Sequence, residues 1–248
     1  MYHQFKQLAD IDITKEPMEV GPTTHYIMGG VRVDADSQMS TAPGLFAAGE
    51  CAAGLHGANR LGGNSLSDLL VFGKRAGEYA AKFAREHGAG KVDEAEIDRA
   101  AIETLAPFER QEREGPYRVQ HDLQALMQDL VGIVRNEADM HRALEAIAML
   151  RRRAAEVGVI GNREYNPGWH TAMDLRSLLV CSEAVTRSAL ERKESRGGHF
   201  REDYPGKDPA YASFNVATRQ GRDGEMLLRR EPVAEMRADL KQIVEENK

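Results

Sequence analysis

The sequence predicts an α/β plus all-α fold class with a small β or irregular ending, and three observations lead to it. Residues 25–73 alternate short apolar runs with glycine clusters and end in helical periodicity. Residues 91–196 carry apolar side chains at the spacing of amphipathic helices. After residue 208 the apolar side chains alternate weakly, as in strands. We therefore divide the chain at residues 1–90, 91–198 and 199–248.

The α/β segment contains one predicted strand. The apolar run Gly44–Ala48 indicates a short buried strand, and Gly49 and Glu50 follow at its C-terminal end. Ligands of open α/β sheets bind at that end of the strands. A carboxylate there can accept hydrogen bonds from two neighbouring hydroxyl groups of a ligand. For a lone Gly-Glu pair, however, an exposed loop acid is the simpler interpretation.

Four glycines, at positions 54, 57, 62 and 63, precede a predicted helix that begins near Leu66 and runs to about Arg85. Asn64 and Ser65 are both typical N-cap residues. A junction of this type presents free backbone N–H groups and the positive end of the helix dipole, which suit an anion. An ordinary capped helix without a ligand is the alternative.

Two polar side chains in this region are candidates for binding an anionic substrate. Arg60 lies in the middle of the glycine-rich loop, where a guanidinium can hold a carboxylate through two parallel hydrogen bonds. His25 begins a strand-like segment interrupted by Gly29 and Gly30, which indicates a hairpin or bulge beside a ligand. A lone histidine is more often structural than functional.

The remaining chain is predicted as helices followed by a hairpin. Helical periodicity covers Val92–Glu109, His121–Val134, Asp139–Val157 and Ala172–Arg192, and the short connections favour an antiparallel bundle. The segment Ser195–Asp203 is dense in Arg, His and Asp, for which we expect a buried ion network or an interface. Asp223-Gly224 predicts a hairpin turn, and the residues after Val233 predict a short helix or a frayed tail.

Composition excludes several classes of protein. The chain has 248 residues, of which 42% are hydrophobic and 29% are charged, as in globular proteins. Its net charge of −6, without a long basic run, argues against a nucleic-acid partner. No apolar run is long enough to span a membrane. Cys51 and Cys181 lack metal-ligand spacing, so we predict no metal site and two buried free thiols.

Three motifs occur together in one order: HYIMGG at 25–30, PGLFAAGE at 43–50 and HGANRLGGNSL at 56–66. With the later segment ERKESRGGHFREDYPGKD at 191–208, they closely resemble the flavoprotein subunit of succinate dehydrogenase and fumarate reductase. The resemblance covers essentially the whole chain. It implies the C-terminal part of an FAD-binding Rossmann-like domain, with the end of a capping domain, at 1–90, and a helical bundle domain at 91–198.

The resemblance also implies the roles of individual residues. His25 and Arg60 would bind a substrate carboxylate, and Glu50 would contact FAD hydroxyl groups. Ser65 and Leu66 would lie against the flavin, and Asn64 is grouped with them as cofactor-binding. The implied reaction interconverts succinate and fumarate by hydride transfer at flavin N5. Electrons would pass to an iron–sulfur subunit, with indirect attachment to membrane anchor subunits at the cytoplasmic face.

The chain also departs from this family. It contains no G-x-G-x-x-G turn, and the arginine that the family uses for proton transfer is absent. We therefore expect a C-terminal fragment that is inactive alone. Two alternatives remain. An L-aspartate oxidase-like flavoenzyme is one, although that branch reads more like NRMASNSL where this chain has NRLGGNSL. A non-catalytic subunit-interaction module is the other.

Overall fold

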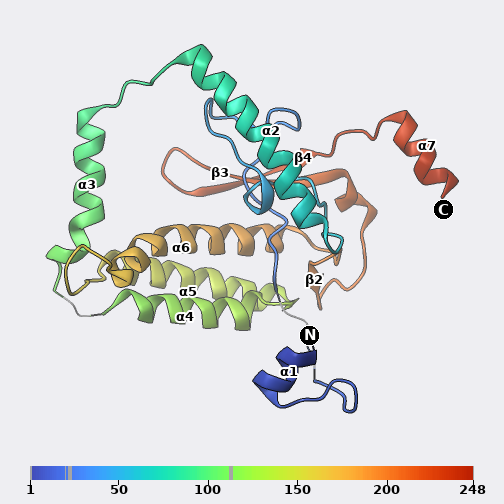
Figure 1. Ribbon diagram of the computed structural model, residues 1–248, viewed down its shortest axis with the longest axis horizontal. Coiled ribbons are helices and arrows are strands. Elements are labelled where there is room, and N and C mark those ends of the chain that lie inside the picture. Colours follow the sequence, from blue (N-terminus) through green and yellow to red (C-terminus); the bar gives the residue numbers. More distant parts are fainter. Residues whose placement is uncertain (1, 20, 22–23, 112–113, 248) are drawn as a thin grey trace.

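The computed structural model describes residues 2–19, 21, 24–111 and 114–247, and it is mostly helical with small sheets (Figure 1). The helices are α1 (Tyr2–Ala9), α2 (Asn64–His87), α3 (Glu94–Glu109), α4 (Pro116–Val131), α5 (Glu137–Ala155), α6 (Pro167–Glu191) and α7 (Ala238–Glu246). The strands are β1 (Val134–Arg135), β2 (Phe200–Arg201), β3 (Phe214–Gln220) and β4 (Met226–Pro232). β1 pairs with β2 in parallel, and β3 pairs with β4 antiparallel.

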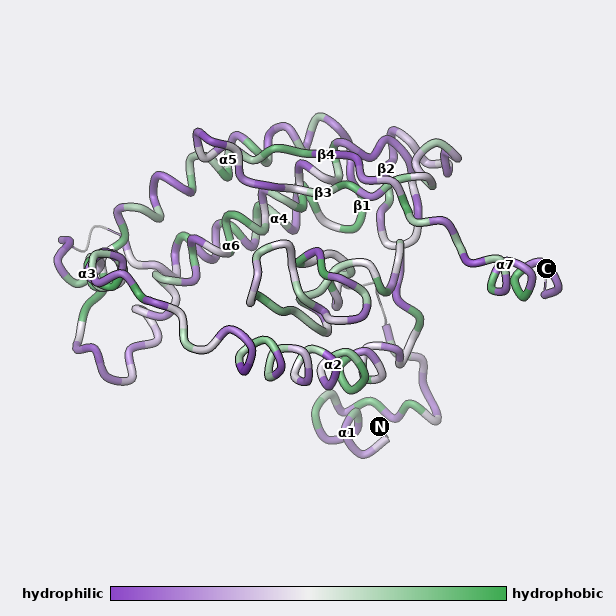
Figure 2. Tube along the Cα trace, turned by 90° about the horizontal axis from the view of Figure 1, so that it is seen from above, coloured by the Kyte–Doolittle hydropathy of each residue, from purple (hydrophilic) through white to green (hydrophobic). Residues whose placement is uncertain are grey.

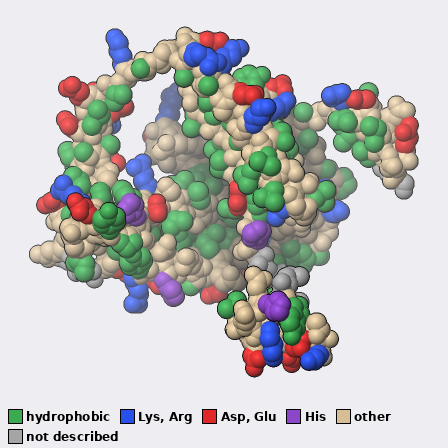
Figure 3. Space-filling view, in the orientation of Figure 1, with side chains coloured by type: hydrophobic (Ala, Val, Ile, Leu, Met, Phe, Trp, Pro, Cys, Tyr) green, Lys and Arg blue, Asp and Glu red, His purple; other side chains and the backbone are tan. Residues whose placement is uncertain are grey.

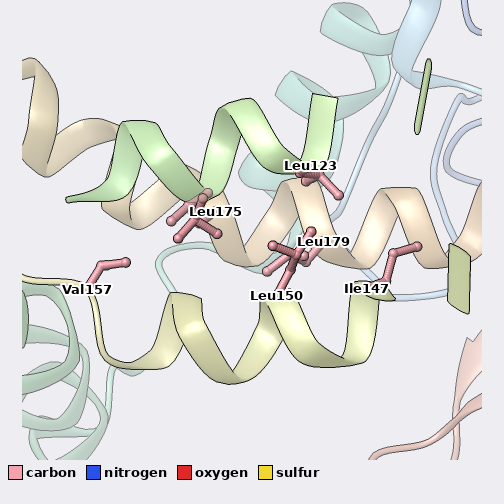
Figure 4. Close-up of a cluster of buried hydrophobic side chains, with 7 residues drawn as sticks. Leu123, Ile147, Leu150, Val157, Leu175 and Leu179 are labelled. Atoms are coloured by element: carbon pink, nitrogen blue, oxygen red, sulfur yellow. The ribbon is translucent and has the colours of Figure 1, made fainter. Parts of the chain in front are cut away.

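Helices α4, α5 and α6 pack against one another and enclose the core (Figure 4). Its buried side chains are Val119, Leu123, Ile147, Leu150, Val157, Leu175 and Leu179. In α5 the fully buried positions are 140, 143, 147 and 150, which is the spacing of one helix face. The predicted helices in this region are confirmed, except that Val134 lies in β1 rather than at the end of a helix.

Helices α5 and α6 begin earlier than the periodicity predicts, because asparagine side chains cap them. The Asn136 side chain accepts a hydrogen bond from the Asp139 N–H at 2.9 Å. The Asn166 side chain accepts one from the Trp169 N–H at 3.0 Å, and Pro167 occupies the first helical position. Such caps satisfy N–H groups that have no partner within the helix, so the helix extends to them.

Trp169, the only tryptophan of the chain, attaches α3 to α6. Its indole N–H donates to the Thr104 carbonyl at 2.7 Å. Its ring also meets Phe108 edge-on, with 5.3 Å between the ring centroids. Aromatic pairs of this geometry add stability beyond the area that they bury. The start of α6 therefore holds α3 through one hydrogen bond and one aromatic contact.

The predicted C-terminal hairpin is confirmed. β3 and β4 pair from Phe214–Pro232 to Gln220–Met226, and Gly224 adopts a φ of 80° in the turn. A positive φ is readily available to glycine, which is why Asp-Gly predicts such turns. The hairpin contacts α6 and lies along the helices in both views, whereas α1 and α7 lie at the edges of the molecule (Figures 1 and 2).

Residues Gly44–Ala48 do not form the predicted strand. Phe46 forms only an isolated antiparallel bridge with Met39, and a separate parallel bridge joins Val31 to Ala52. Ala47 is nevertheless buried. A strand exists only where another strand supplies its hydrogen bonds, and an apolar run does not contain that information.

Helix α2 is confirmed, and Gly88 forms its C-cap with a φ of 68°. Few of its side chains pack against the rest of the described chain. Asp68 is its only buried residue there, whereas Leu70 is 76% exposed. Figure 3 shows hydrophobic side chains gathered on the surface over α2. The apolar stripe that makes α2 predictable is therefore largely open.

The predicted N-cap of α2 and the predicted burial of the two cysteines are wrong. Neither Asn64 nor Ser65 caps α2; Gly63 takes the N-cap position in a left-handed conformation, with a φ of 83°. Cys51 and Cys181 are free, as predicted, but exposed rather than buried.

Within the described ranges, no helix is both long and apolar enough to cross a membrane. The same ranges contain no group of three or more His, Cys, Asp or Glu side chains placed to hold a metal ion.

Candidate functional site

The glycine-rich loop folds back onto the segment that begins with His25. The guanidinium carbon of Arg60 lies 4.6 Å from the centre of the Tyr26 ring, within the range of a cation–π interaction. The Tyr26 and His56 rings meet edge-on, with 5.4 Å between their centroids. The structure thus brings the HYIMGG and HGANR motifs into direct contact through Tyr26.

Tyr26 is held by two buried polar side chains that the sequence did not single out. Its hydroxyl donates to Asp68 Oδ2 at 3.3 Å and lies 3.4 Å from His56 Nε2. His56 Nε2 is in turn 3.2 Å from Asp68 Oδ2, and both side chains are less than one tenth exposed. Burial first, and the charge of Asp68 second, raise the pKa of Tyr26 above its ordinary value.

Arg60 has unused hydrogen-bonding capacity at this point. Its Nη1 donates to the neighbouring Leu61 carbonyl at 3.3 Å. Its Nε is buried and has no hydrogen-bond partner, the only such side-chain atom in the described part of the chain. A buried donor without a partner costs free energy unless another group binds it. The loop therefore holds a guanidinium in which Nε lacks an acceptor.

Glu50 and His25 belong to the same neighbourhood. Glu50 lies in a short 3₁₀ helix, Gly49–Cys51, and its Oε1 accepts a hydrogen bond from the Ile27 N–H at 3.0 Å. One carboxylate oxygen of Glu50 thus fixes the strand-like segment two residues after His25. The His25 side chain itself is exposed. His25 directly precedes Tyr26 in the chain, whereas Glu50 reaches the same segment from a distant part of the sequence through the Ile27 N–H.

Asn64, Ser65 and Leu66 form the first turn of α2, four to six residues after Arg60. The N–H groups of Asn64 and Leu66 donate to loop carbonyls at 3.2 Å. Leu66 is 67% exposed, so its apolar side chain points away from the core. The positive end of the α2 dipole therefore lies at the same loop as the Arg60 guanidinium.

The segment Ser195–Asp203 is a buried ion network, one of the two structural roles expected for it. The Glu194 carboxylate is fully buried and binds Arg196 at 2.8 and 2.9 Å and Arg192 at 2.5 Å. Burial alone would raise the pKa of Glu194, but bonds from Arg196, the Asp208 N–H and Arg192 lower it to about 2.

His199 and Arg201 extend this network. The His199 ring lies 3.0 Å from the Arg192 carbonyl through Nε2 and 3.1 Å from Arg135 Nη1 through Nδ1. These partners assign the proton to Nε2, so that Nδ1 accepts from Arg135. Burial lowers the pKa of His199, in agreement with a neutral ring. The fully buried Arg201 binds Asp203 at 2.6 and 2.7 Å and lowers the pKa of that carboxyl to about 2.

The arrangement around Arg60 suits a ligand with negative charge. The Arg60 guanidinium, whose Nε has no acceptor, and the start of α2 both lie at the glycine-rich loop. Glycines at 54, 57, 62 and 63 have nothing within 4 Å of the position that a Cβ would take, so this backbone can be approached closely. These donors and this open backbone fit an anionic cofactor together with a carboxylate substrate.

Residues 1–66, which include Tyr26 and Arg60, match the family described as FAD binding domain, so this part of the chain belongs to a class of flavin-binding proteins. Residues 120–244, half of the chain, match the family described as fumarate reductase flavoprotein C-term. The chain belongs to the family of fumarate reductase and succinate dehydrogenase flavoprotein subunits.

Relatives of known name agree with this assignment. The fumarate reductase flavoprotein subunit of Haemophilus influenzae is 40% identical over 204 residues, covering 80% of this chain and 34% of the relative. A chain of the Mycobacterium smegmatis Sdh1 complex superposes with a TM-score of 0.89 at 51% identity, covering 96% of this chain and 41% of that one. A chain of the Escherichia coli quinol fumarate reductase gives 0.83 at 33% identity, covering 94% and 40%. The chain thus spans about a third of the length of the curated relatives.

Proposed function

We propose that this chain supplies the substrate-carboxylate site and part of the FAD site of an enzyme that interconverts succinate and fumarate. The observation that carries the proposal is the Arg60 guanidinium, which lies over Tyr26 with a buried and unbonded Nε. A dicarboxylate provides an acceptor for this Nε, and a paired geometry makes such a contact directional.

Each residue around Arg60 has a distinct part in this proposal. Tyr26 supports the guanidinium from one side, and Asp68 and His56 hold the Tyr26 hydroxyl in place. His25 gives the second polar contact to the substrate. FAD, when bound, supplies the hydride chemistry. Charge that develops on the substrate carboxylate in the transition state is stabilised by Arg60, which is already oriented before the reaction begins.

Glu50 and the first turn of α2 provide the contacts to the cofactor in this proposal. Glu50 uses one oxygen for the Ile27 N–H, which leaves the other for a cofactor hydroxyl. Asn64, Ser65 and Leu66 contribute the first turn of α2, whose dipole favours negative charge at this place. Within this proposal, residues 1–90 form the C-terminal part of a Rossmann-like FAD-binding domain with the end of a capping domain. Residues 91–198 form an antiparallel helical bundle, and residues 199–248 a small C-terminal segment.

The proposal includes partner subunits. Electrons would leave through an iron–sulfur subunit, and membrane anchor subunits would attach the assembly indirectly to the cytoplasmic face of a membrane. The likeness to chains of the Mycobacterium smegmatis Sdh1 complex and of quinol fumarate reductase supports this part.

A chimera tests the proposal. The 248 residues replace the matching segment of the Mycobacterium smegmatis Sdh1 chain, which is 51% identical. We expect this chimera to hold stoichiometric FAD, measured by its absorption after denaturation, and to oxidise succinate with a dye as acceptor. A folded chimera that never binds FAD would instead favour a non-catalytic subunit-interaction module. A chimera that holds FAD but prefers L-aspartate would indicate the L-aspartate oxidase branch.

A further inference from the structure

The turn Arg196–His199 touches both of the segments that form the Tyr26–Arg60 pair. The Gly198 N–H donates to the Ala58 carbonyl at 3.0 Å, and Ala58 is two residues before Arg60. On the other segment, the end of the Met28 side chain lies 3.3 Å from the position of a Cβ at Gly198. Met28 is two residues after Tyr26, so a single turn contacts both motifs.

No side chain fits between this turn and the glycine-rich loop. Gly197 has a φ of +60°, and a Cβ there would lie 2.2 Å from the Ala58 oxygen and 2.5 Å from its carbonyl carbon. These are backbone atoms, which cannot rotate away as the end of a side chain can. Any residue other than glycine would therefore push the loop that carries Arg60.

The turn is itself held firmly from the opposite side. Arg196 and His199 exchange backbone hydrogen bonds of 2.8 and 3.0 Å across it. The buried Glu194 carboxylate holds the Arg196 side chain by two bonds, and the His199 ring is joined to Arg135 and to the Arg192 carbonyl. The turn is thus attached to β1 and to the end of α6, and the glycine-rich loop rests on it.

We propose that the Arg196–His199 turn positions the Arg60 guanidinium for its carboxylate, with Gly197 as the positioning residue. The helical half of the chain would thereby set the geometry of a site whose ligand-binding side chains lie in the other half. Gly197 itself touches neither substrate nor cofactor in this scheme. The inference rests on the proposed function, because it assumes that Arg60 binds a substrate carboxylate.

The test uses Gly197→Ala in the chimera, with malonate as the probe. Malonate carries two carboxylates on one carbon and cannot be dehydrogenated to an alkene, so it reports binding alone. We expect malonate to bind roughly tenfold more weakly, because a small displacement of a positioning group has effects of at least this size. The FAD content and the flavin absorption spectrum should equal those of the parent, and KM for succinate should rise by a similar factor.

Gly224→Ala is the matched control. Gly224 also has a positive φ, +80°, but a Cβ there would meet only the Gln220 side chain, at 3.9 Å. The control therefore shares the backbone strain of Gly197→Ala without the collision. Its malonate affinity should equal that of the parent.

His199→Gln is a second variant that needs no strained backbone, and it carries the test if Gly197→Ala does not fold. It loosens the turn from Arg135, so we expect weaker malonate binding at full FAD content. If the folded variants bind FAD and malonate as the parent does, the positioning role is wrong. If the parent chimera holds FAD but does not bind malonate, the proposed function is wrong and this inference falls with it.

Discussion

Arg60 lies on an aromatic ring with one nitrogen bonded to its own loop and another buried without an acceptor. Lysine would keep the positive charge but lose the planar fork that holds a carboxylate by two bonds. We expect Arg60→Lys to lower kcat/KM for succinate in the chimera by a factor on the order of 100, since charged hydrogen bonds are worth a few kcal/mol.

The FAD content of the Arg60→Lys chimera should remain complete, which steady-state kinetics and flavin absorption together would establish. Arg118→Lys serves as the control, because the Arg118 side chain is 75% exposed on α4. A lysine variant that turns over succinate like the parent would remove Arg60 from the substrate site.

Tyr26 gives a second prediction at this scale. Burial and the Asp68 charge both raise its pKa, so Asp68→Asn should lower that pKa while leaving the part that burial causes. Ultraviolet difference titration of the chain measures this change. The step that belongs to Tyr26 is identified as the one missing in Tyr26→Phe. An unchanged titration in Asp68→Asn would contradict the contact between the two side chains.

Single residues differ in how visible they are in the sequence. Arg60 could be singled out from the sequence because a structural core does not need a charged residue inside a glycine-rich loop. Tyr26, His56 and Asp68 were missed as a group because hydrogen bonds join positions 26, 56 and 68, which no local spacing connects. Asp68 is the one buried residue of α2 in the described part of the chain, and no local pattern marks it in the sequence.

Among the elements, the helices α4–α6 could be predicted because their periodicity records the face that packs. Their first turns were harder, since Asn136 and Asn166 begin α5 and α6 by side-chain caps outside the apolar stripe. The strand Gly44–Ala48 could not be judged from its own residues, because its partners determine whether it forms. The hairpin β3–β4 was predicted correctly because its turn is specified by neighbouring residues in the sequence.

The ion network around the Arg196–His199 turn leads to a prediction of stability. The pKa of Glu194 is about 2 in the folded chain against an ordinary value of 4.5, so the folded state favours the ionised carboxylate. This contribution is complete above pH 4.5 and is lost as the pH falls toward 2. Asp203, also with a pKa of about 2, adds to the same loss.

Glu194→Gln should therefore lower the free energy of unfolding at neutral pH by about 3 kcal/mol, because Arg192 and Arg196 lose their buried counter-charge. It should also reduce the dependence of stability on pH between 4.5 and 2, with the part from Asp203 remaining. Urea unfolding of the chain across this range measures both effects. Equal stability of the variant and the parent at neutral pH would show that the network contributes nothing net.

At the scale of the whole molecule, the apolar face of α2 is open to solvent. Leu70 is 76% exposed and Val71 is 52% exposed, and contiguous apolar surface of this kind promotes association. We expect the chain alone to self-associate as its concentration rises, and Leu70→Ser to reduce this tendency. Sedimentation velocity measures it. Val92→Ser, at a residue that is 70% exposed near the start of α3, is the control.

The attachment of α3 through Trp169 has a spectroscopic consequence. As the chain has one tryptophan, all of its indole fluorescence comes from Trp169, whose ring contacts Thr104 and Phe108 of α3. A red shift of that emission therefore signals the release of α3 from α6, even where the core of α4, α5 and α6 is intact. Thermal or urea unfolding followed by fluorescence alone would report this one junction, and circular dichroism is needed to follow the helices themselves.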